Sequence, residues 1–159
     1  MDCTVTSFEC PTIGPQACRE LVPDQLTATL VAAKAADVVV LVLGLNAKIT
    51  NMEGQDREHD EVGYALPGKQ VALAHQIAAL GKPTIAVVLS GMAVGMDFLA
   101  EQAKERNTTS TTPAHVPWSL VVPGYGARFG AESLAEMLFG KFSPSGRLAY
   151  TVSDILTRQ

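Results

Sequence analysis

The sequence contains no run of lysine or arginine residues and no basic patch. Twelve Lys and Arg residues stand against sixteen Asp and Glu residues, which gives a formal net charge of −4 at pH 7. Proteins that bind nucleic acid concentrate positive charge on one face or along one helix. The charge distribution therefore argues against nucleic acid as a partner.

Cysteine is scarce, and its spacing gives no sign of a metal site. Cys3, Cys10 and Cys18 match no zinc pattern. An odd number of cysteines cannot pair completely, so reduced or buried thiols are favoured over one disulfide with a spare thiol. The histidines also lack a histidine or cysteine partner at metal-ligand spacing. We therefore expect no metal and no other cofactor.

Long apolar runs and several well-known motifs are absent too. No run approaches the roughly 20 residues of a membrane span, and the start Met1–Thr4 lacks the basic and apolar regions of a secretory signal. We expect no membrane partner; a mature secreted protein or a fragment would look the same, so the compartment stays open. Without a G-x-G-x-x-G or Walker pattern, a nucleotide site is the weakest hypothesis. Ser90 lacks the G-x-S-x-G context of a hydrolase nucleophile.

The remaining composition is that of an ordinary globular protein. Hydrophobic residues make up 47% of the 159 residues and charged residues 18%. A chain of this length can bury a sizeable core without disulfides or metal. We expect a single domain over residues 1–159.

Apolar strands alternate with amphipathic helices along the chain. The expected strands are 38–43, 85–89 and 118–122, with a short edge strand at 4–8, and the first has no polar alternation, as expected for a strand covered on both faces. Apolar stripes predict helices beginning beside Pro23 and covering residues near 71–78, 96–103 and 134–138. The order predicts an α/β fold, a three-layer α/β/α sandwich with a mostly parallel sheet. The polar stretch 106–115 is expected to be a mobile loop.

The most informative segment for chemistry is 52–57, Met-Glu-Gly-Gln-Asp-Arg, which follows the first apolar strand. Ligands of parallel α/β sheets meet the loops at the carboxyl ends of strands. Glu53 could exchange a proton there if its surroundings raise its pKa. Asp56 and Arg57 could pin the loop, and His59 could reach a substrate. From residue type alone, a solvated loop glutamate and surface charges are the commoner interpretation.

An ordered set of short strings points to a family. The set comprises Ala35–Val40, Leu43–Asn46, Glu53–Arg57, Leu66–Gln70, Val122–Gly124 and Leu138–Leu148. In this order and spacing, over roughly residues 24–152, the chain resembles the C-terminal α/β domain of glycoside hydrolase family 3, the β-glucosidases and β-xylosidases. The string Phe-Gly-Lys-Phe-Ser-Pro-Ser-Gly-Arg-Leu at 139–148 is the most specific of the set.

The resemblance implies one half of a carbohydrate-cleaving site. A complete enzyme of the family has an N-terminal (β/α)8 barrel with an aspartate nucleophile, and the α/β domain lends a glutamate acid/base. That glutamate corresponds to Glu53, with Asp56 and Arg57 in the same pattern. Retaining hydrolysis needs two carboxyl groups about 5 Å apart. This chain lacks the barrel, so we expect almost no turnover by the chain alone.

The chain also departs from the family pattern. Asn51 stands where many members carry another glutamate, Met92-Ala93 stands where Gly-Pro is frequent, and the stretch 58–65 is longer than usual. The sheet is expected to lack the first strand of the family domain. The alternative to a glycosidase half is a non-catalytic sugar- or partner-binding α/β module, with homodimerisation through an exposed docking face.

Overall fold

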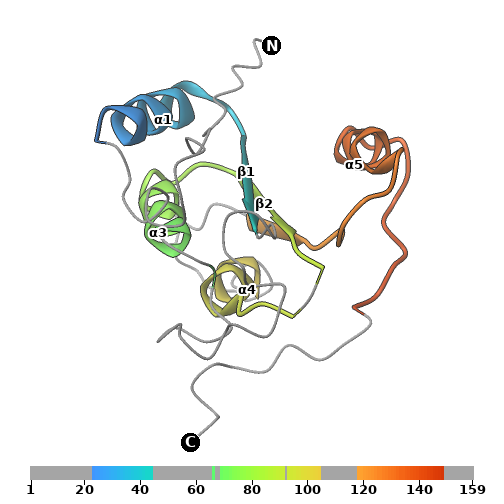
Figure 1. Cartoon of the computed structure of the whole chain (residues 1–159). Coiled ribbons are helices and arrows are strands. Elements are labelled where there is room, and N and C mark those ends of the chain that lie inside the picture. The colour runs from blue at the N-terminus through green and yellow to red at the C-terminus, as the bar shows by residue number, and fades with distance from the viewer. Residues whose placement is uncertain (1–22, 45–65, 67–68, 92, 105–117, 149–159) are drawn as a thin grey trace, which may run out of the picture.

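A computed structural model describes residues 23–44, 66, 69–91, 93–104 and 118–148. Helices and strands alternate along these residues (Figure 1). Their bounds are α1 Pro23–Ala35, β1 Val39–Gly44, α3 Gln70–Ala79, β2 Thr84–Leu89, α4 Asp97–Lys104, β3 Trp118–Val121 and α5 Gly130–Leu138. Every strand and helix that the sequence predicts within this part of the chain is present, with ends displaced by a few residues.

The three described strands form one parallel sheet in the order β1-β2-β3. Val39 lies beside Thr84 on β2, and Thr84 lies beside Trp118 on β3. Because parallel strands need long connections, α3 and α4 carry the chain from one strand to the next. The predicted α/β class with a parallel sheet is confirmed.

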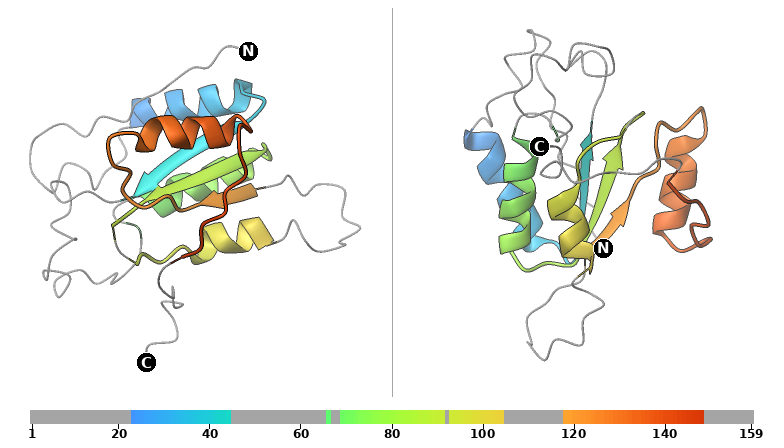
Figure 2. Two further views of the ribbon diagram at one scale, coloured as in Figure 1. Left: turned by 90° about the vertical axis from the view of Figure 1, so that its right-hand side faces the viewer. Right: turned by 90° about the horizontal axis from the view of Figure 1, so that it is seen from below.

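Helices lie on both sides of this sheet. Figure 2 shows α1, α3 and α4 against one face and α5 on the opposite side.

The sequence explains where α5 ends: Gly140 follows α5 with a φ of +79°, which glycine adopts readily. There the amide of Gly140 donates to the carbonyl of Met137 (3.0 Å), and the amide of Lys141 donates to that of Glu136 (2.9 Å). This pattern is a Schellman motif, which satisfies the last carbonyls of a helix.

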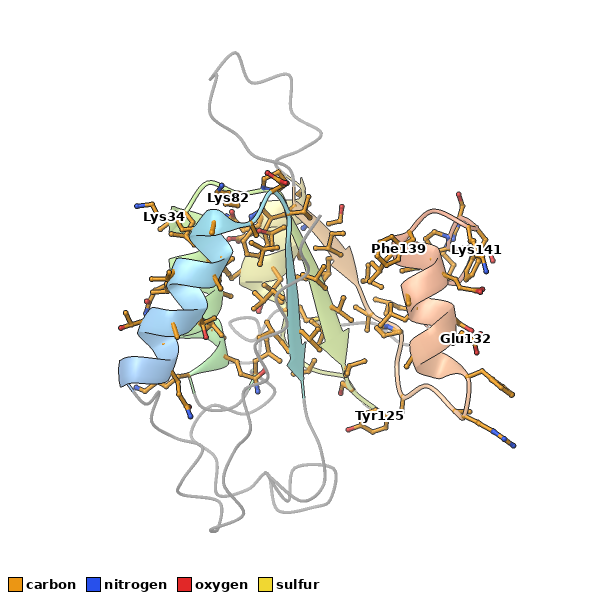
Figure 3. The ribbon with its side chains drawn as sticks, turned by 90° about the horizontal axis from the view of Figure 1, so that it is seen from above. Lys34, Lys82, Tyr125, Glu132, Phe139 and Lys141 are labelled. Carbon is orange, nitrogen blue, oxygen red and sulfur yellow. The ribbon has the colours of Figure 1, made fainter. Side chains whose placement is uncertain are left out.

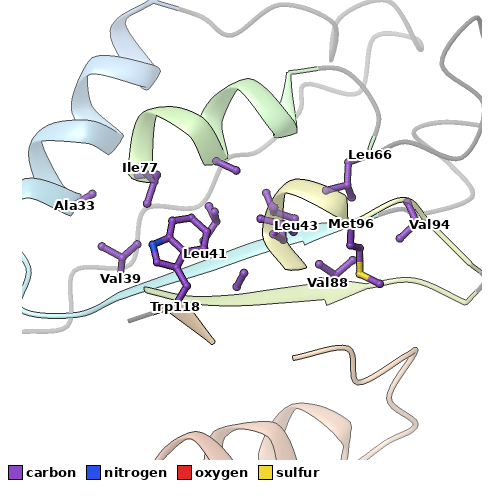
Figure 4. Close-up of a cluster of buried hydrophobic side chains, with 13 residues drawn as sticks. Ala33, Val39, Leu41, Leu43, Leu66, Ile77, Val88, Val94, Met96 and Trp118 are labelled. Atoms are coloured by element: carbon purple, nitrogen blue, oxygen red, sulfur yellow. The ribbon is translucent and has the colours of Figure 1, made fainter. Parts of the chain in front are cut away.

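The main core lies between the sheet and the three helices on its first face. Leu41 and Leu43 of β1, Ile77 of α3 and Leu99 of α4 are buried together there, and Figure 4 shows part of this cluster. Trp118, at the start of β3, is 3% exposed and packs edge-on against Phe98 with ring centroids 6.3 Å apart. The apolar stripes that the sequence predicts for α1, α3 and α4 therefore face this core, whereas α5 lies on the other side of the sheet.

The second face of the sheet is covered unevenly, which corrects one expectation. On β2, Val87 and Val88 point to opposite faces and both are fully buried. On β1, Val40 and Val42 remain 50% and 57% exposed, so only one face of that strand is covered. The prediction that β1 is buried on both faces was wrong for the described structure. The apolar run does not show that Val40 and Val42 are exposed. The helix on their side of the sheet, α5, leaves them uncovered and has no buried residue of its own.

Two other expectations concern residues outside the described part. The edge strand at 4–8 and the polar loop at 106–115 both lie there. Both stay predictions.

Candidate functional site

The carboxyl ends of the three strands lie along one edge of the sheet, because the strands are parallel. Gly44 ends β1, Leu89 ends β2 and Val121 ends β3. Figure 3 shows Tyr125, shortly after β3, at this edge, with Lys34 and Lys82 at the opposite end. In open α/β sheets this edge is where ligands bind.

Gly44 has a backbone conformation at this edge that leaves no room for a side chain. Its φ is +142°, in a region that residues with side chains rarely adopt. A Cβ added to Gly44 would lie 1.9 Å from the carbonyl oxygen of Leu89 and 2.8 Å from its carbonyl carbon. Both are backbone atoms, which cannot rotate aside as the end of a side chain could. Only glycine fits at the end of β1.

The side chain of Gln70 holds the same glycine from the start of α3. The amide of Gly44 donates to Oε1 of Gln70 at 2.8 Å, and Nε2 of Gln70 donates to the carbonyl oxygen of Gly44 at 2.9 Å. One carboxamide thus satisfies the donor and the acceptor of a single residue, as a neighbouring strand would. Both groups are partly buried, which shields the bonds from water.

The turns that follow β2 and β3 lie next to each other. Ser90, directly after β2, is 2% exposed, and its carbonyl oxygen lies 4.0 Å from the position of a Cβ on Gly124. Tyr125, the next residue, is 50% exposed. A buried serine and a half-exposed aromatic ring thus flank the same strand ends.

The structure leaves the predicted site residues untested. Glu53, Asp56, Arg57 and His59 lie outside the described residues, so their roles stay predictions. The described chain stops at Gly44 and resumes at Leu66, so the segment that carries them starts at the carboxyl end of β1.

Gln70 and Tyr125 were not predicted as site residues. Gln70 is the last residue of a string that pointed to the family, Leu66–Gln70, and Tyr125 directly follows another, Val122–Gly124. These positions were the only available signal. Periodicity marks Gln70 as an ordinary first residue of a helix, and it marks Tyr125 as a turn residue. Their places at the strand ends follow from the fold.

Within the described ranges, no group of three or more His, Cys, Asp or Glu side chains could hold a metal ion. No helix in that part of the chain has both the length and the apolar character needed to cross a membrane.

Comparison with known proteins identifies the fold and the family. Residues 8–158 match the family described as Glycosyl hydrolase family 3 C-terminal domain. The probable beta-D-xylosidase 6 of Arabidopsis thaliana is 35% identical over 120 residues, covering 75% of this chain and 13% of the relative. The probable beta-D-xylosidase 7 of the same plant is 34% identical over 137 residues, covering 85% and 15%.

A solved structure shares the fold. The beta-glucosidase from Kluyveromyces marxianus, in complex with glucose, superposes with a TM-score of 0.57 at 22% identity. The superposition covers 79% of this chain and 13% of that one. The chain thus spans about one seventh of the length of the relatives it matches. Because the family match extends over nearly all of the sequence, this chain belongs to glycosyl hydrolase family 3 and corresponds to its C-terminal domain.

Proposed function

We propose that this chain is the acid/base-bearing part of a retaining β-glycosidase of the β-glucosidase or β-xylosidase type. The match of residues 8–158 to the family 3 C-terminal domain is the observation that carries the proposal. The names of the relatives, which include β-xylosidases and a β-glucosidase, support a β-glycoside as substrate. The start of the Glu53 segment at the carboxyl end of β1 supports a role at that edge.

Glu53 would act twice in the reaction. In the first step the carboxyl group of Glu53 gives its proton to the glycosidic oxygen while an aspartate of the barrel attacks the anomeric carbon. The carbon–oxygen bond to the leaving group breaks, and a glycosyl–aspartate ester forms. In the second step the carboxylate of Glu53 takes a proton from water, which attacks the anomeric carbon and releases the sugar and the aspartate. Asp56 and Arg57 would hold the segment, and His59 would lie near the substrate.

The nucleophile would belong to a barrel domain, in the same polypeptide or in a partner. General acid/base catalysis contributes roughly 10²- to 10⁴-fold, which is small beside the whole acceleration of an enzyme. We therefore expect negligible turnover of aryl β-glucosides and β-xylosides by the 159-residue chain alone. Rapid hydrolysis by the pure chain that depends on Glu53 would contradict this.

The acid/base role is tested by the choice of leaving group. In a complex of the chain with a separately expressed family 3 barrel, Glu53→Gln should slow hydrolysis of alkyl glycosides by about 10²- to 10⁴-fold. Dinitrophenyl glycosides should suffer far less in the first step, because dinitrophenolate leaves without a proton. Glu61→Gln, in the same segment, is the matched control and should leave both rates unchanged. Equal losses for both leaving groups, or the same pattern in Glu61→Gln, would refute the assignment.

A non-catalytic sugar- or partner-binding module is the second candidate, and exposed apolar side chains favour its partner-binding form. Val40, Val42 and Phe139 expose half or more of their side chains in the described structure, with Phe139 at 85%. Exposed apolar patches mark surfaces at which proteins associate. Light scattering separates the candidates: a monomer with saturable sugar binding favours a module, whereas a dimer or larger species favours a domain without its partner.

A further inference from the structure

The side-chain carboxamide of Gln70 forms a long-range hydrogen-bonded pair with the backbone of Gly44. Gln70 is the first residue of α3, yet its carboxamide pairs with both backbone groups of Gly44, 26 residues earlier. Side chains at helix starts commonly bond the free amides of their own first turn. Here Lys69, at the cap position, makes no side-chain cap bond, and the carboxamide of Gln70 is committed to β1 instead.

This pair ties the two ends of one segment together. Gly44 is the last residue of β1, and Gln70 opens the helix to which the chain returns. The 25 residues between them (70 − 44 − 1) include Glu53. Fixing both ends of a segment removes conformations from everything between them. The direction in which the chain leaves the sheet is then set by the Gly44 peptide.

We propose that Gln70 is a positioning residue for the acid/base segment, residues 45–65. By hydrogen-bonding both backbone groups of Gly44, Gln70 would fix the position of Glu53 in the site. The inference rests on the proposed function. The two carboxyl groups of a retaining glycosidase must lie about 5 Å apart, so small displacements of one are costly. A misplacement of 1 Å can lower a rate about 10²-fold.

Gly44 is the second residue of this hydrogen-bonded pair. The Cβ of any other residue would collide with the carbonyl of Leu89. Gly44 can therefore pair with Gln70 in this conformation only because it has no side chain. The carboxamide of Gln70 is equally specific, since it must present an acceptor and a donor 2.8 and 2.9 Å from their partners. A carboxylate offers two acceptors and no donor, and a methionine offers no donor and only a weak thioether acceptor.

The first test measures amide hydrogen exchange in the whole 159-residue chain. In Gln70→Met, protection of the Gly44 amide should fall about tenfold, because its acceptor is gone. Deuterium uptake by residues 45–65 should accelerate as well. Gln76→Met, on the same helix, is the matched control and should change neither. Unchanged protection at Gly44, or unchanged uptake in 45–65, overturns the inference.

Gln70→Glu supplies a second variant with a pH signature. Below the pKa of the introduced group, near 4.3 for an ordinary glutamate, the protonated carboxyl can accept from the Gly44 amide and donate to its carbonyl, as the carboxamide does. Above that pKa, two oxygens face each other without a proton. The excess uptake of 45–65 over wild type should therefore vanish at low pH and grow as pH rises. A pH-independent excess would mean that Gln70 only fills space, and would overturn the proposal.

Activity separates this inference from the proposed function. In the complex with a barrel, Gln70→Met should lower kcat by about 10- to 100-fold with little change in KM. If Glu53→Gln abolishes acid catalysis while Gln70→Met keeps the wild-type kcat, positioning by Gln70 is refuted and the function stands. If Gln70→Met accelerates deuterium uptake by 45–65 but Glu53→Gln is fully active, the proposed role of Glu53 is refuted. The Gly44–Gln70 pair would then order the segment without positioning an acid/base.

Discussion

Three glycine substitutions test whether a side chain fits at Gly44, beside Leu89 of β2. Gly146→Ala meets no atom within 4 Å and no positive φ, Gly140→Ala meets open space at a φ of +79°, and Gly44→Ala meets both a φ of +142° and the backbone of Leu89. The series thus adds the conformational strain and the collision one at a time.

The expected costs follow from the structure. Gly146→Ala should change the free energy of unfolding by less than about 0.5 kcal/mol, and Gly140→Ala should cost about 1–2 kcal/mol for its left-handed backbone. In Gly44→Ala the Leu89 oxygen must move from 1.9 Å to ordinary contact near 3.4 Å, a shift of about 1.5 Å. We expect Gly44 to move as well, which would break its two bonds to Gln70, about 1 kcal/mol each. The backbone conformation adds about 1–3 kcal/mol of strain. The total is roughly 3–5 kcal/mol.

Urea denaturation followed by circular dichroism measures the series. With a slope of about 2 kcal/mol per molar urea, Gly44→Ala should lower the midpoint by about 2 M. The reasoning would be refuted if Gly44→Ala cost no more than Gly140→Ala, because the collision with Leu89 would then be absent.

Two further predictions test the two faces of the sheet and the helix that covers the core. Val88→Thr, at a fully buried position, should cost about 1–3 kcal/mol by burying a hydroxyl, whereas Val42→Thr should cost less than about 0.5 kcal/mol in the isolated chain. Equal losses in thermal denaturation would show that β1 is covered on both faces. Ile77→Ala should cost about 2–5 kcal/mol, because Ile77 is 1% exposed. Gln76→Ala, its neighbour on the same helix, should be nearly neutral; a similar loss there would contradict the assigned helix face.

The Gly44–Gln70 pair would give the acid/base proposal a structural basis outside the reacting groups. Glu53 is proposed to transfer the proton, while the residues that fix its delivery would lie in the rigid sheet and helix. A site supported by regular elements is held more accurately than one supported by its own loop.

The sequence predicted the regular elements well, and for local reasons. Unbroken apolar residues indicated β1 and β2, and stripes at helical spacing indicated α1 and α3, because side-chain direction repeats every two residues in strands and every 3.6 in helices. The same reasoning failed for the second face of β1. Val40 and Val42 are as apolar as Leu41 and Leu43, so residue type does not show that they are exposed. In the described structure α5, on their side of the sheet, leaves them uncovered.

The position of residues 52–57 after an apolar strand selected the segment, and only the resemblance to a family assigned a role to Glu53. Glu53 is one of many glutamates that a solvated loop could carry, and its residue type gives no reason to select it. Gln70 was hidden for a different reason. Its partner is 26 residues away, and no periodic pattern relates a helix start to the end of an earlier strand.

The sequence alone determined the order of strands and helices, the apolar positions and the family strings. Each of these features depends on residues near one another in the chain. The approach of Gly44 to Leu89, the reach of Gln70 to β1 and the exposed valines of β1 were decided by tertiary structure. These features depend on which segments meet in space, and that follows from packing the whole sheet against its helices.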